Sequence, residues 1–269
     1  MSFSIETDFT DGIERISYIP DNIRYKTPLI FQHGAWHGAW CWQWWQEVFA
    51  ELGWASHAHS LPSHGKSDLK RNIRLCTLGY YRDALAQQIN RLDTKPVVIG
   101  HSMGGAITQW YISHIGDLPA GVLLASMPLY DNMLRYIVAD PIGMALASLY
   151  LHAKPLVRSP ERVKHLFISD NALMSPEELH QKLGAESALM PLQLNPLTWH
   201  PKKNPDTPML VMACENDTIF TIKEEETLAS HYGADYYLIE NTAHNAMMEW
   251  NYRESAEYLH QWLLKQGIE

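Results

Sequence analysis

The sequence predicts an α/β fold in which helices cover both faces of a mostly parallel central sheet, with a helical cap inserted late in the chain. Short apolar runs that predict strands alternate with helical patterns, the order expected of parallel strands joined by crossover helices. The run at 97–99 is apolar throughout, as expected of a strand covered on both faces. Residues 127–205 show only helical patterns, so we expect 1–126 and 206–269 to form the core and 127–205 the cap.

The first half of the predicted core alternates strands and helices regularly. Residues 12–19 alternate apolar and polar side chains, which is typical of an antiparallel edge strand. A helical pattern over 42–52 ends before Gly53, a residue suited to the left-handed conformation that follows many helices. The other expected elements are strands at 28–32 and 54–59 and an amphipathic helix over 77–92.

The second half continues this alternation around the predicted cap. The expected core elements are strands at 97–99, 121–125, 208–213 and 235–240, with helices over 103–115, 221–231 and 250–265. Within the cap, the pattern predicts helices over 131–151, 159–168 and 175–183. The last of these begins with Ser175, Pro176 and Glu178, which predict an N-cap, a proline at the first helical position and a capping box.

Composition argues against several classes of function. A formal net charge of −9 gives no basic face for nucleic acid or an anionic membrane, and no apolar run is long enough to span a bilayer. The acidic first residues lack the basic and apolar regions of a signal peptide. Three cysteines without a pairing pattern favour a reducing compartment. We therefore expect a cytoplasmic protein that binds neither nucleic acid nor membrane; its oligomeric state is left open.

The strand predicted at 97–99 stops at Gly100-His101-Ser102-Met103-Gly104 and continues as a helical pattern. A Gly-x-Ser-x-Gly sequence between a strand and a helix is typical of a nucleophile elbow, a tight turn that lifts the serine hydroxyl above the sheet. The helix N-terminus behind Ser102 supplies free N–H groups that favour developing negative charge. An ordinary glycine-rich turn is the competing interpretation. Residues elsewhere in the sequence distinguish between the two.

A serine hydroxyl becomes a good nucleophile when a base takes its proton and a carboxylate orients that base. Asp217 and His244 each follow a predicted strand. Because the carboxyl ends of parallel strands meet at one edge of a sheet, Ser102, Asp217 and His244 are expected to converge there as a catalytic triad. Glu215 and Asp206 are the alternative acids, although Asp206 precedes its strand and is poorly placed.

The negative oxygen of a tetrahedral intermediate needs two backbone N–H donors. We assign one to Met103, directly after the nucleophile, and the other to Ala35, in the loop after the strand at 28–32. Trp36, Gly34 and His101 are neighbours of these residues in the chain, and we assign them to substrate binding.

Over nearly its whole length the chain resembles the α/β-hydrolase fold superfamily. The matching features are the run 33–40 (His-Gly-Ala-Trp-His-Gly-Ala-Trp), the turn 63–67, the elbow at 100–105, Asp217 and His244. The first run resembles the branch that holds plant methylesterases, hydroxynitrile lyases and related bacterial esterases. The resemblance implies carboxylic-ester chemistry with no metal and no organic cofactor. Hydroxynitrile lyases typically carry Thr where Gly34 stands and Lys where Asn245 stands, so both positions favour ester hydrolysis.

Other patterns have weaker functional interpretations. His57 and His59 alternate along a predicted strand as metal ligands can, but the rest of a metal-dependent hydrolase motif does not follow, so no metal is expected. No Gly-x-Gly-x-x-Gly sequence follows a strand, which argues against a dinucleotide cofactor. Five tryptophans lie between 36 and 45; packing of the first helix on the sheet is their favoured role, and walling an acyl pocket is the alternative.

The sequence therefore predicts a serine hydrolase of esters or lactones with a hydrophobic acyl part, working through an acyl-enzyme on Ser102. Its expected partner is a small-molecule ester or lactone. A quorum-quenching N-acyl homoserine lactonase and a general carboxylesterase are both compatible with the residues. Two alternatives stay open: hydrolysis of a C–C bond in a ring-cleavage product, which uses the same triad, and a non-catalytic small-molecule receptor on the same fold.

Overall fold

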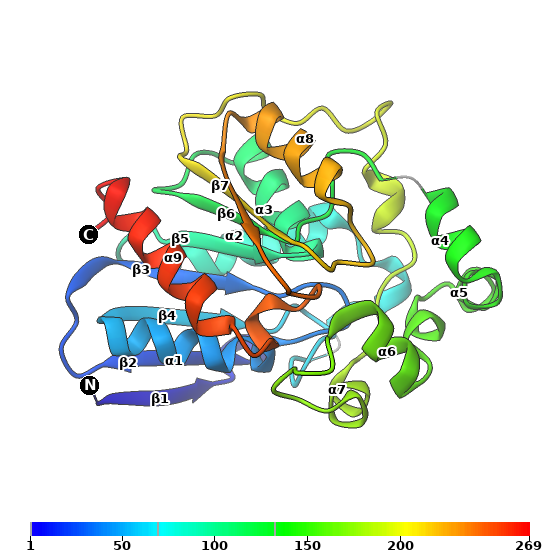
Figure 1. The fold of residues 1–269 in the computed structure, drawn as a ribbon, viewed down its shortest axis with the longest axis horizontal. Coiled ribbons are helices and arrows are strands. Elements are labelled where there is room, and N and C mark those ends of the chain that lie inside the picture. The colour runs from blue at the N-terminus through cyan, green and yellow to red at the C-terminus, as the bar shows by residue number, and fades with distance from the viewer. Residues whose placement is uncertain (1, 69, 132) are drawn as a thin grey trace.

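One sheet of eight strands organises the computed structural model, which describes residues 2–68, 70–131 and 133–269 (Figure 1). Among these residues the strand order is β1-β2-β4-β3-β5-β6-β7-β8. β2 pairs antiparallel with β1 and β4, and every other neighbouring pair is parallel. The bounds are Phe3–Asp8 (β1), Arg15–Pro20 (β2), Tyr25–Gln32 (β3), Trp54–His59 (β4), Val97–His101 (β5), Gly121–Leu124 (β6), Met209–Cys214 (β7) and Asp235–Ile239 (β8). The predicted α/β fold with a mostly parallel sheet is confirmed.

The antiparallel edge of the sheet differs from the sequence prediction. The pattern at 12–19 predicts the edge strand, but the structure has β2 there, between β1 and β4, and β1 at the edge. None of the β1 side chains is buried and four of the six are exposed, so this strand is attached mainly by backbone pairing with β2. The alternation in β2 therefore predicts a strand correctly but gives its place in the sheet wrongly.

Helices cover both faces of the parallel part of the sheet. α1 (Gln43–Leu52) and α9 (Tyr252–Lys265) share one face, and α2 (Leu78–Ile89), α3 (Met103–His114) and α8 (Ile222–Tyr232) cover the other. β5 shows the period of two that this arrangement requires, since Val97 and Ile99 pack with α1 and α9 whereas Val98 packs with α2 and α3. These helices lie close to their predicted positions.

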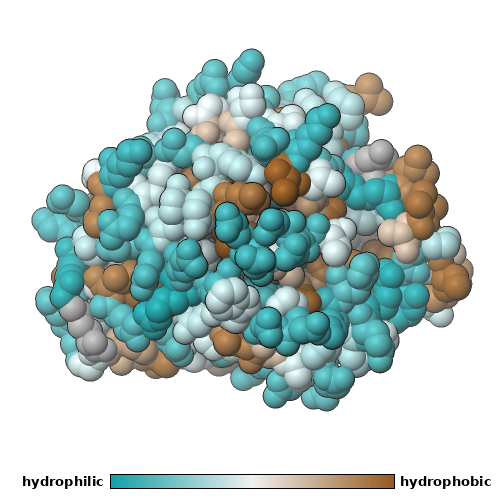
Figure 2. Space-filling view, in the orientation of Figure 1, coloured by the Kyte–Doolittle hydropathy of each residue, from teal (hydrophilic) through white to brown (hydrophobic). Residues whose placement is uncertain are grey.

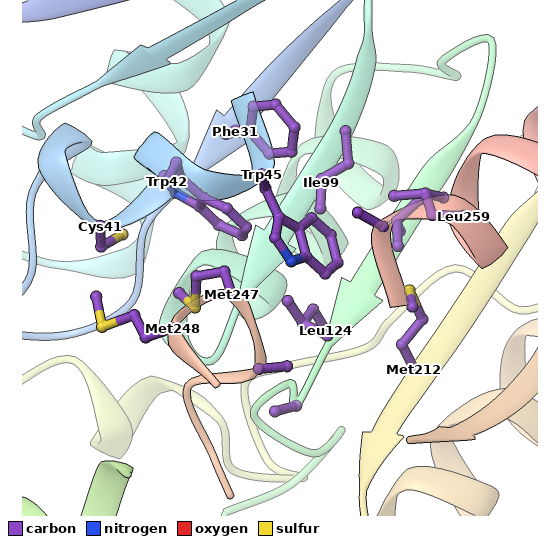
Figure 3. Packing of buried hydrophobic residues seen from close by; sticks show 14 of the residues in the cluster. Phe31, Cys41, Trp42, Trp45, Ile99, Leu124, Met212, Met247, Met248 and Leu259 are labelled. Atoms are coloured by element: carbon purple, nitrogen blue, oxygen red, sulfur yellow. The ribbon is translucent and has the colours of Figure 1, made fainter. Parts of the chain in front are cut away.

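The tryptophan cluster contributes largely to the core. Trp42 and Trp45 are fully buried against Phe31, and Met247 and Leu259 belong to the same cluster beneath α1 and α9 (Figure 3). Aromatic side chains of this size bury much apolar surface and fix how α1 sits on the sheet. Packing is therefore the main role of these two residues, in agreement with the favoured interpretation.

Four α-helices lie between β6 and β7 in the described part of the chain, at one end of the molecule (Figure 1). They are α4 (Met133–Ala139), α5 (Pro141–Tyr150), α6 (Pro160–Phe167) and α7 (Pro176–Lys182). The single helix predicted over 131–151 is wrong. Asp140 caps α5 by accepting the Gly143 N–H at 2.9 Å, and Pro141 lacks the N–H that a continuous helix needs. None of the described helices is both long and apolar enough to cross a bilayer.

A buried ion pair joins this cap segment to the core. His64, in the turn after β4, donates through Nε2 to Glu186 at 2.9 Å and through Nδ1 to the Pro62 carbonyl at 3.2 Å. The other Glu186 oxygen accepts the Tyr81 hydroxyl at 2.8 Å. Both His64 nitrogens face acceptors, which favours the imidazolium. Burial lowers the pKa of His64, but the Glu186 carboxylate outweighs burial and raises that pKa above its ordinary value.

The first turn of α3 lies against the end of β3. A Cβ placed on Gly104 would meet the Gln32 carbonyl oxygen at 2.2 Å and the His33 carbonyl oxygen at 2.8 Å. Both contacts are with backbone, which cannot rotate away as a flexible side chain can. Glycine at 104 therefore sets how closely the turn at Ser102 approaches the loop after β3.

Gly104→Ala is expected to lower the free energy of unfolding by about 1–3 kcal/mol, because α3 and β3 must separate to admit the methyl group. Gly79→Ala in α2 is the matched control, since the nearest atom would lie 3.7 Å from its new Cβ and alanine favours a helix. Urea unfolding followed by circular dichroism measures both variants. Equal stability of the two would contradict the importance of this contact.

The His64–Glu186 pair predicts a pH-dependent stability. A histidine whose pKa is raised by folding stabilises the protein fully below its unfolded pKa of about 6.5, and loses this contribution as pH rises through the folded pKa. The free energy of unfolding is therefore expected to fall as pH rises above about 6.5. Glu186→Gln should be less stable below this pH and show a smaller fall above it. Urea titrations along the pH series measure both slopes, and identical slopes would refute the assignment.

Candidate active site

Ser102 occupies a strained turn between β5 and α3. Its backbone has φ 54° and ψ −118°, a positive φ that an L-residue rarely adopts. Its N–H donates to the Leu124 carbonyl at 3.0 Å, and its carbonyl accepts the N–H groups of Gly105 at 3.0 Å and Met127 at 3.1 Å. The residue is 8% exposed and lines a cavity. This is the geometry of a nucleophile elbow.

His244 and Asp217 meet in the loops after β8 and β7. His244 Nδ1 donates to Asp217 Oδ2 at 2.7 Å, and both side chains are almost fully buried. The N–H groups of Ile219 and Phe220 donate to Asp217 Oδ1 at 2.7 and 3.1 Å, which fixes the orientation of the carboxylate. His244 Nε2 has no hydrogen-bond partner among the described residues, so its lone pair is available to take a proton.

The structure brings Ser102 and His244 to the same site. The ring of His101, the residue before Ser102, lies 4.7 Å from the His244 ring between centroids. Phe220 lies 5.6 Å from His244 by the same measure and lines the cavity together with Ser102. The three residues predicted as a catalytic triad therefore converge at the carboxyl ends of β5, β7 and β8.

The two alternative acids lie outside this arrangement. Glu215 is exposed and accepts the Asn241 N–H at 2.8 Å, and Asp206 is exposed before β7. Asp217 is thus the carboxylate that orients His244. Among the described residues, no three His, Cys, Asp or Glu side chains lie closely enough together to hold a metal ion.

Two free backbone N–H groups lie beside Ser102. Met103 is the first residue of α3, so its N–H has no acceptor inside the helix. The Ala35 N–H donates to no acceptor among the described residues. Both residues line the same cavity as Ser102. Their amides are available to a developing oxyanion, which is the role assigned to them from the sequence.

One of the three residues assigned to substrate binding lines the cavity. Trp36 does so, and its Nε1 donates to the Ala153 carbonyl of the cap segment at 3.1 Å. His101 is fully buried behind the elbow, where Nε2 donates to the His244 carbonyl at 3.0 Å. Gly34 is buried too, and a Cβ there would come within 2.9 Å of Ser102 Cβ. His101 packs against His244 and Gly34 permits the close approach of its loop, and neither residue lines the cavity.

Two residues outside the predicted set hold the loop of His244. His37 Nδ1 donates to the Ala35 carbonyl at 2.7 Å, and His37 Nε2 accepts from the Asn245 side-chain amide at 3.0 Å. Burial, reinforced by the nearby His244, lowers the pKa of His37 to about 4 and keeps the ring neutral. The Asn245 N–H donates to the Phe167 carbonyl of α6 at 2.8 Å. No local pattern could reveal the His37–Asn245 pair, since its members are 208 residues apart.

A cavity of about 900 Å³ extends from Ser102 beneath α4 and α5. Several charged groups in its wall are paired with other side chains: Arg135 with Glu224 of α8, and Arg162 with Asp140. The apolar residues of the wall include Ala35, Met103, Met127, Ala139, Met144, Ala147, Leu151, Leu156, Leu166, Leu189, Met190, Leu192, Ile219 and Phe220. The cavity therefore suits a large apolar group next to a polar reacting centre.

Residues 29–257 match the family described as the alpha/beta hydrolase family. The chain is 23% identical to the pFDCC methylesterase of Arabidopsis thaliana, over 81% of this chain and 87% of that protein. It is 34% identical to Methylesterase 2 of Arabidopsis thaliana, but that match spans about a third of each protein, 30% of this chain and 31% of the relative. These relatives agree with the methylesterase-like branch predicted from the run at 33–40.

Solved structures show the same fold. A thermophilic esterase from Thermogutta terrifontis aligns with a TM-score of 0.66 at 19% identity, covering 99% of both chains. A putative lipase from Acinetobacter baumannii AYE aligns with a TM-score of 0.70 at 16% identity, over 98% of this chain and 92% of the other. The family match covers most of the sequence and includes all three residues of the predicted triad, and on this basis the chain belongs to the alpha/beta hydrolase family.

Proposed function

We propose that the protein hydrolyses carboxylic esters through an acyl-enzyme on Ser102. His244 Nε2 takes the hydroxyl proton as Ser102 Oγ attacks the ester carbonyl carbon. The amides of Ala35 and Met103 bind the negative oxygen of the tetrahedral intermediate. As the intermediate collapses, the proton passes from His244 to the leaving alcohol and the acyl group stays on Ser102. Water then attacks the acyl-enzyme with His244 as the base, which releases the acid and restores the hydroxyl.

The observation that carries this proposal is the buried Asp217–His244 pair beside Ser102. His244 becomes an imidazolium in each proton transfer, and a carboxylate 2.7 Å from Nδ1 stabilises that charge. The same bond holds the tautomer whose Nε2 lone pair is unpaired. The positive φ of Ser102 adds a second, independent feature, because such strain persists where the surrounding structure maintains it.

The cavity supports a substrate with a large hydrophobic group. A volume of about 900 Å³ is near the upper end for small-molecule sites, and the charged pairs in the wall leave few free polar groups away from Ser102. The methylesterases among the relatives favour an ester of a small alcohol, and the cavity of this chain favours a bulky acyl part. An N-acyl homoserine lactone meets the same requirement, with the lactone ring at Ser102 and the acyl chain beneath α5.

We also infer that the protein acts in the cytoplasm. Cys41, Cys76 and Cys214 are all buried and unpaired, as is usual where thiols stay reduced. Burial raises the pKa of each of these thiols, which keeps them protonated and unreactive.

Ser102→Ala and Asp217→Asn test the mechanism. Loss of the nucleophile is expected to lower kcat for p-nitrophenyl butyrate by at least about 10⁴-fold, and loss of the orienting charge by about 10³–10⁴-fold. Steady-state kinetics at mildly alkaline pH measure both. KM should change much less than kcat, because neither side chain contributes to the apolar wall that binds the acyl group.

Glu215→Gln is the matched control, because Glu215 lies in the same loop as Asp217 but accepts from Asn241 instead of His244. Its kcat is expected to stay near the wild-type value. A fluorophosphonate probe should label the wild type but not Ser102→Ala. Wild-type protein that is neither labelled nor active would favour the receptor alternative. Protein that cleaves a vinylogous 1,5-diketone but hydrolyses no ester would favour C–C bond hydrolysis.

The substrate class is tested with p-nitrophenyl esters of increasing acyl length and with N-acyl homoserine lactones. Each added methylene is expected to raise kcat/KM by about threefold while the chain still fits the cavity. Ala147→Phe, which narrows the cavity beneath α5, should remove this gain for long chains and leave acetate hydrolysis unchanged. A flat chain-length profile in the wild type would contradict an acyl site in the cavity.

A further inference from the structure

The outer face of α4 and α5 is apolar and exposed to solvent. Val138 is 74% exposed, Leu149 73% and Ile142 67%, and Ile137 and Tyr150 are exposed beside them. We call these five residues the cap face. In the space-filling view, hydrophobic side chains gather at the edge of the molecule where α4 and α5 lie (Figure 2). The main apolar patch on a monomeric protein is often a functional contact surface.

The inner face of the same helices lines the cavity. Ala139 of α4 and Met144 and Ala147 of α5 belong to its wall. Ile142 and Leu149, seven residues apart, share the opposite side of α5. A helix at the surface of a globular protein normally turns charged or polar side chains to water. α5 is instead mainly apolar on both sides, and the outer residues of α4 are apolar as well, so core packing does not explain the outer residues.

The cap face carries no negative charge, although the chain has a net charge of −9. Asp140 is the only acidic residue in the sequence between 133 and 151. Its side chain is buried in ion pairs with Arg158 and Arg162, so it does not reach the cap face. The surface is therefore suited to an apolar phase and not to a charged partner.

The cavity opens beside the cap face. Leu151, directly after α5, and Leu192 both line the cavity, and they are 55% and 52% exposed. Two apolar side chains thus belong at once to the wall of the cavity and to the surface of the protein. An apolar molecule can pass from the cap face to the cavity along these side chains.

The size of the cap face argues against a second copy or another protein as its occupant. α4 has 7 residues and α5 has 10, so at about 1.5 Å per residue they are roughly 10 and 15 Å long. Strips about 10 Å wide along both helices cover about 250 Å², whereas a stable protein interface buries about 800 Å² on each partner. An apolar liquid surface needs neither a larger area nor a matching shape.

We propose that the cap face docks onto an emulsion droplet of the apolar ester that the enzyme hydrolyses. The inference rests on the proposed ester hydrolysis. Docking takes the exposed side chains of α4 and α5 out of water, which is the driving force for binding. It also places Leu151 and Leu192 at the droplet surface, so that an ester molecule enters the cavity without crossing bulk water.

Flotation with emulsified tributyrin tests the docking step. Protein with Ser102→Ala, which leaves the droplets intact, is expected to rise with them through a density gradient. Adding Val138→Ser and Leu149→Ser should lower the partition coefficient into the droplet fraction by at least about tenfold, because both side chains are mostly exposed and neither lines the cavity. Ile5→Ser with Ile23→Ser is the control, since both side chains are more than half exposed but lie near the β1 edge of the sheet. The control variant, which also carries Ser102→Ala, should float as well as Ser102→Ala alone.

Kinetics separate docking from chemistry. With Ser102 present, activity on tributyrin is expected to rise steeply above its solubility limit. Val138→Ser with Leu149→Ser should remove this rise and leave hydrolysis of dissolved p-nitrophenyl acetate unchanged. Flotation without turnover of any ester would refute the proposed function and leave docking standing. Docking is refuted if the parent stays in the aqueous phase, if the Val138 and Leu149 variant floats equally well, or if sedimentation shows that this variant breaks a dimer.

Discussion

The close contact between the first turn of α3 and the end of β3 determines the arrangement of the site. Gly104 lies against the Gln32 carbonyl, so the turn before it must pass directly beside the loop that follows β3. This places the N–H groups of Met103 and Ala35 along the same cavity as the Ser102 hydroxyl. A positive φ and two unpaired donors both cost free energy, and the hydrogen bonds around Ser102 offset part of that cost. The reactive arrangement thus depends on a packing contact that involves no reactive group.

Features that form a local pattern in the sequence could be predicted. The Gly-x-Ser-x-Gly run after an apolar strand identifies Ser102. Asp217 and His244 follow from the rule that functional groups gather at the carboxyl ends of parallel strands. The parallel sheet and its helices follow from alternating apolar runs and helical patterns. The break between α4 and α5 was also encoded locally, by Pro141, but the apolar pattern across it predicts one helix.

Features that depend on distant contacts could not be predicted. Glu186 lies in an irregular stretch, and the fold alone brings it to His64. The sequence contains fourteen histidines but does not show which of them the fold buries. In the structure, burial lowers the pKa of His37 and His101, whereas a buried carboxylate raises the pKa of His64. The position of His101 next to Ser102 in the sequence does not show that its ring is buried behind the elbow, against His244. β1 was missed because it lies at the edge of the sheet and contributes no fully buried side chain.

The hydrogen bond from Asn245 to the Phe167 carbonyl gives the cap a second role besides covering the cavity. It fixes α6 to the loop that carries His244, so the cap and the proton-transfer machinery are mechanically coupled. A chimera that exchanges residues 127–205 for the corresponding segment of a relative would change the support of His244 together with the substrate range. Recombination that aims at new specificity has to preserve the main chain at Phe167. Side chains on α4 and α5 can be varied without touching that bond, which makes these two helices the natural place to diversify a library.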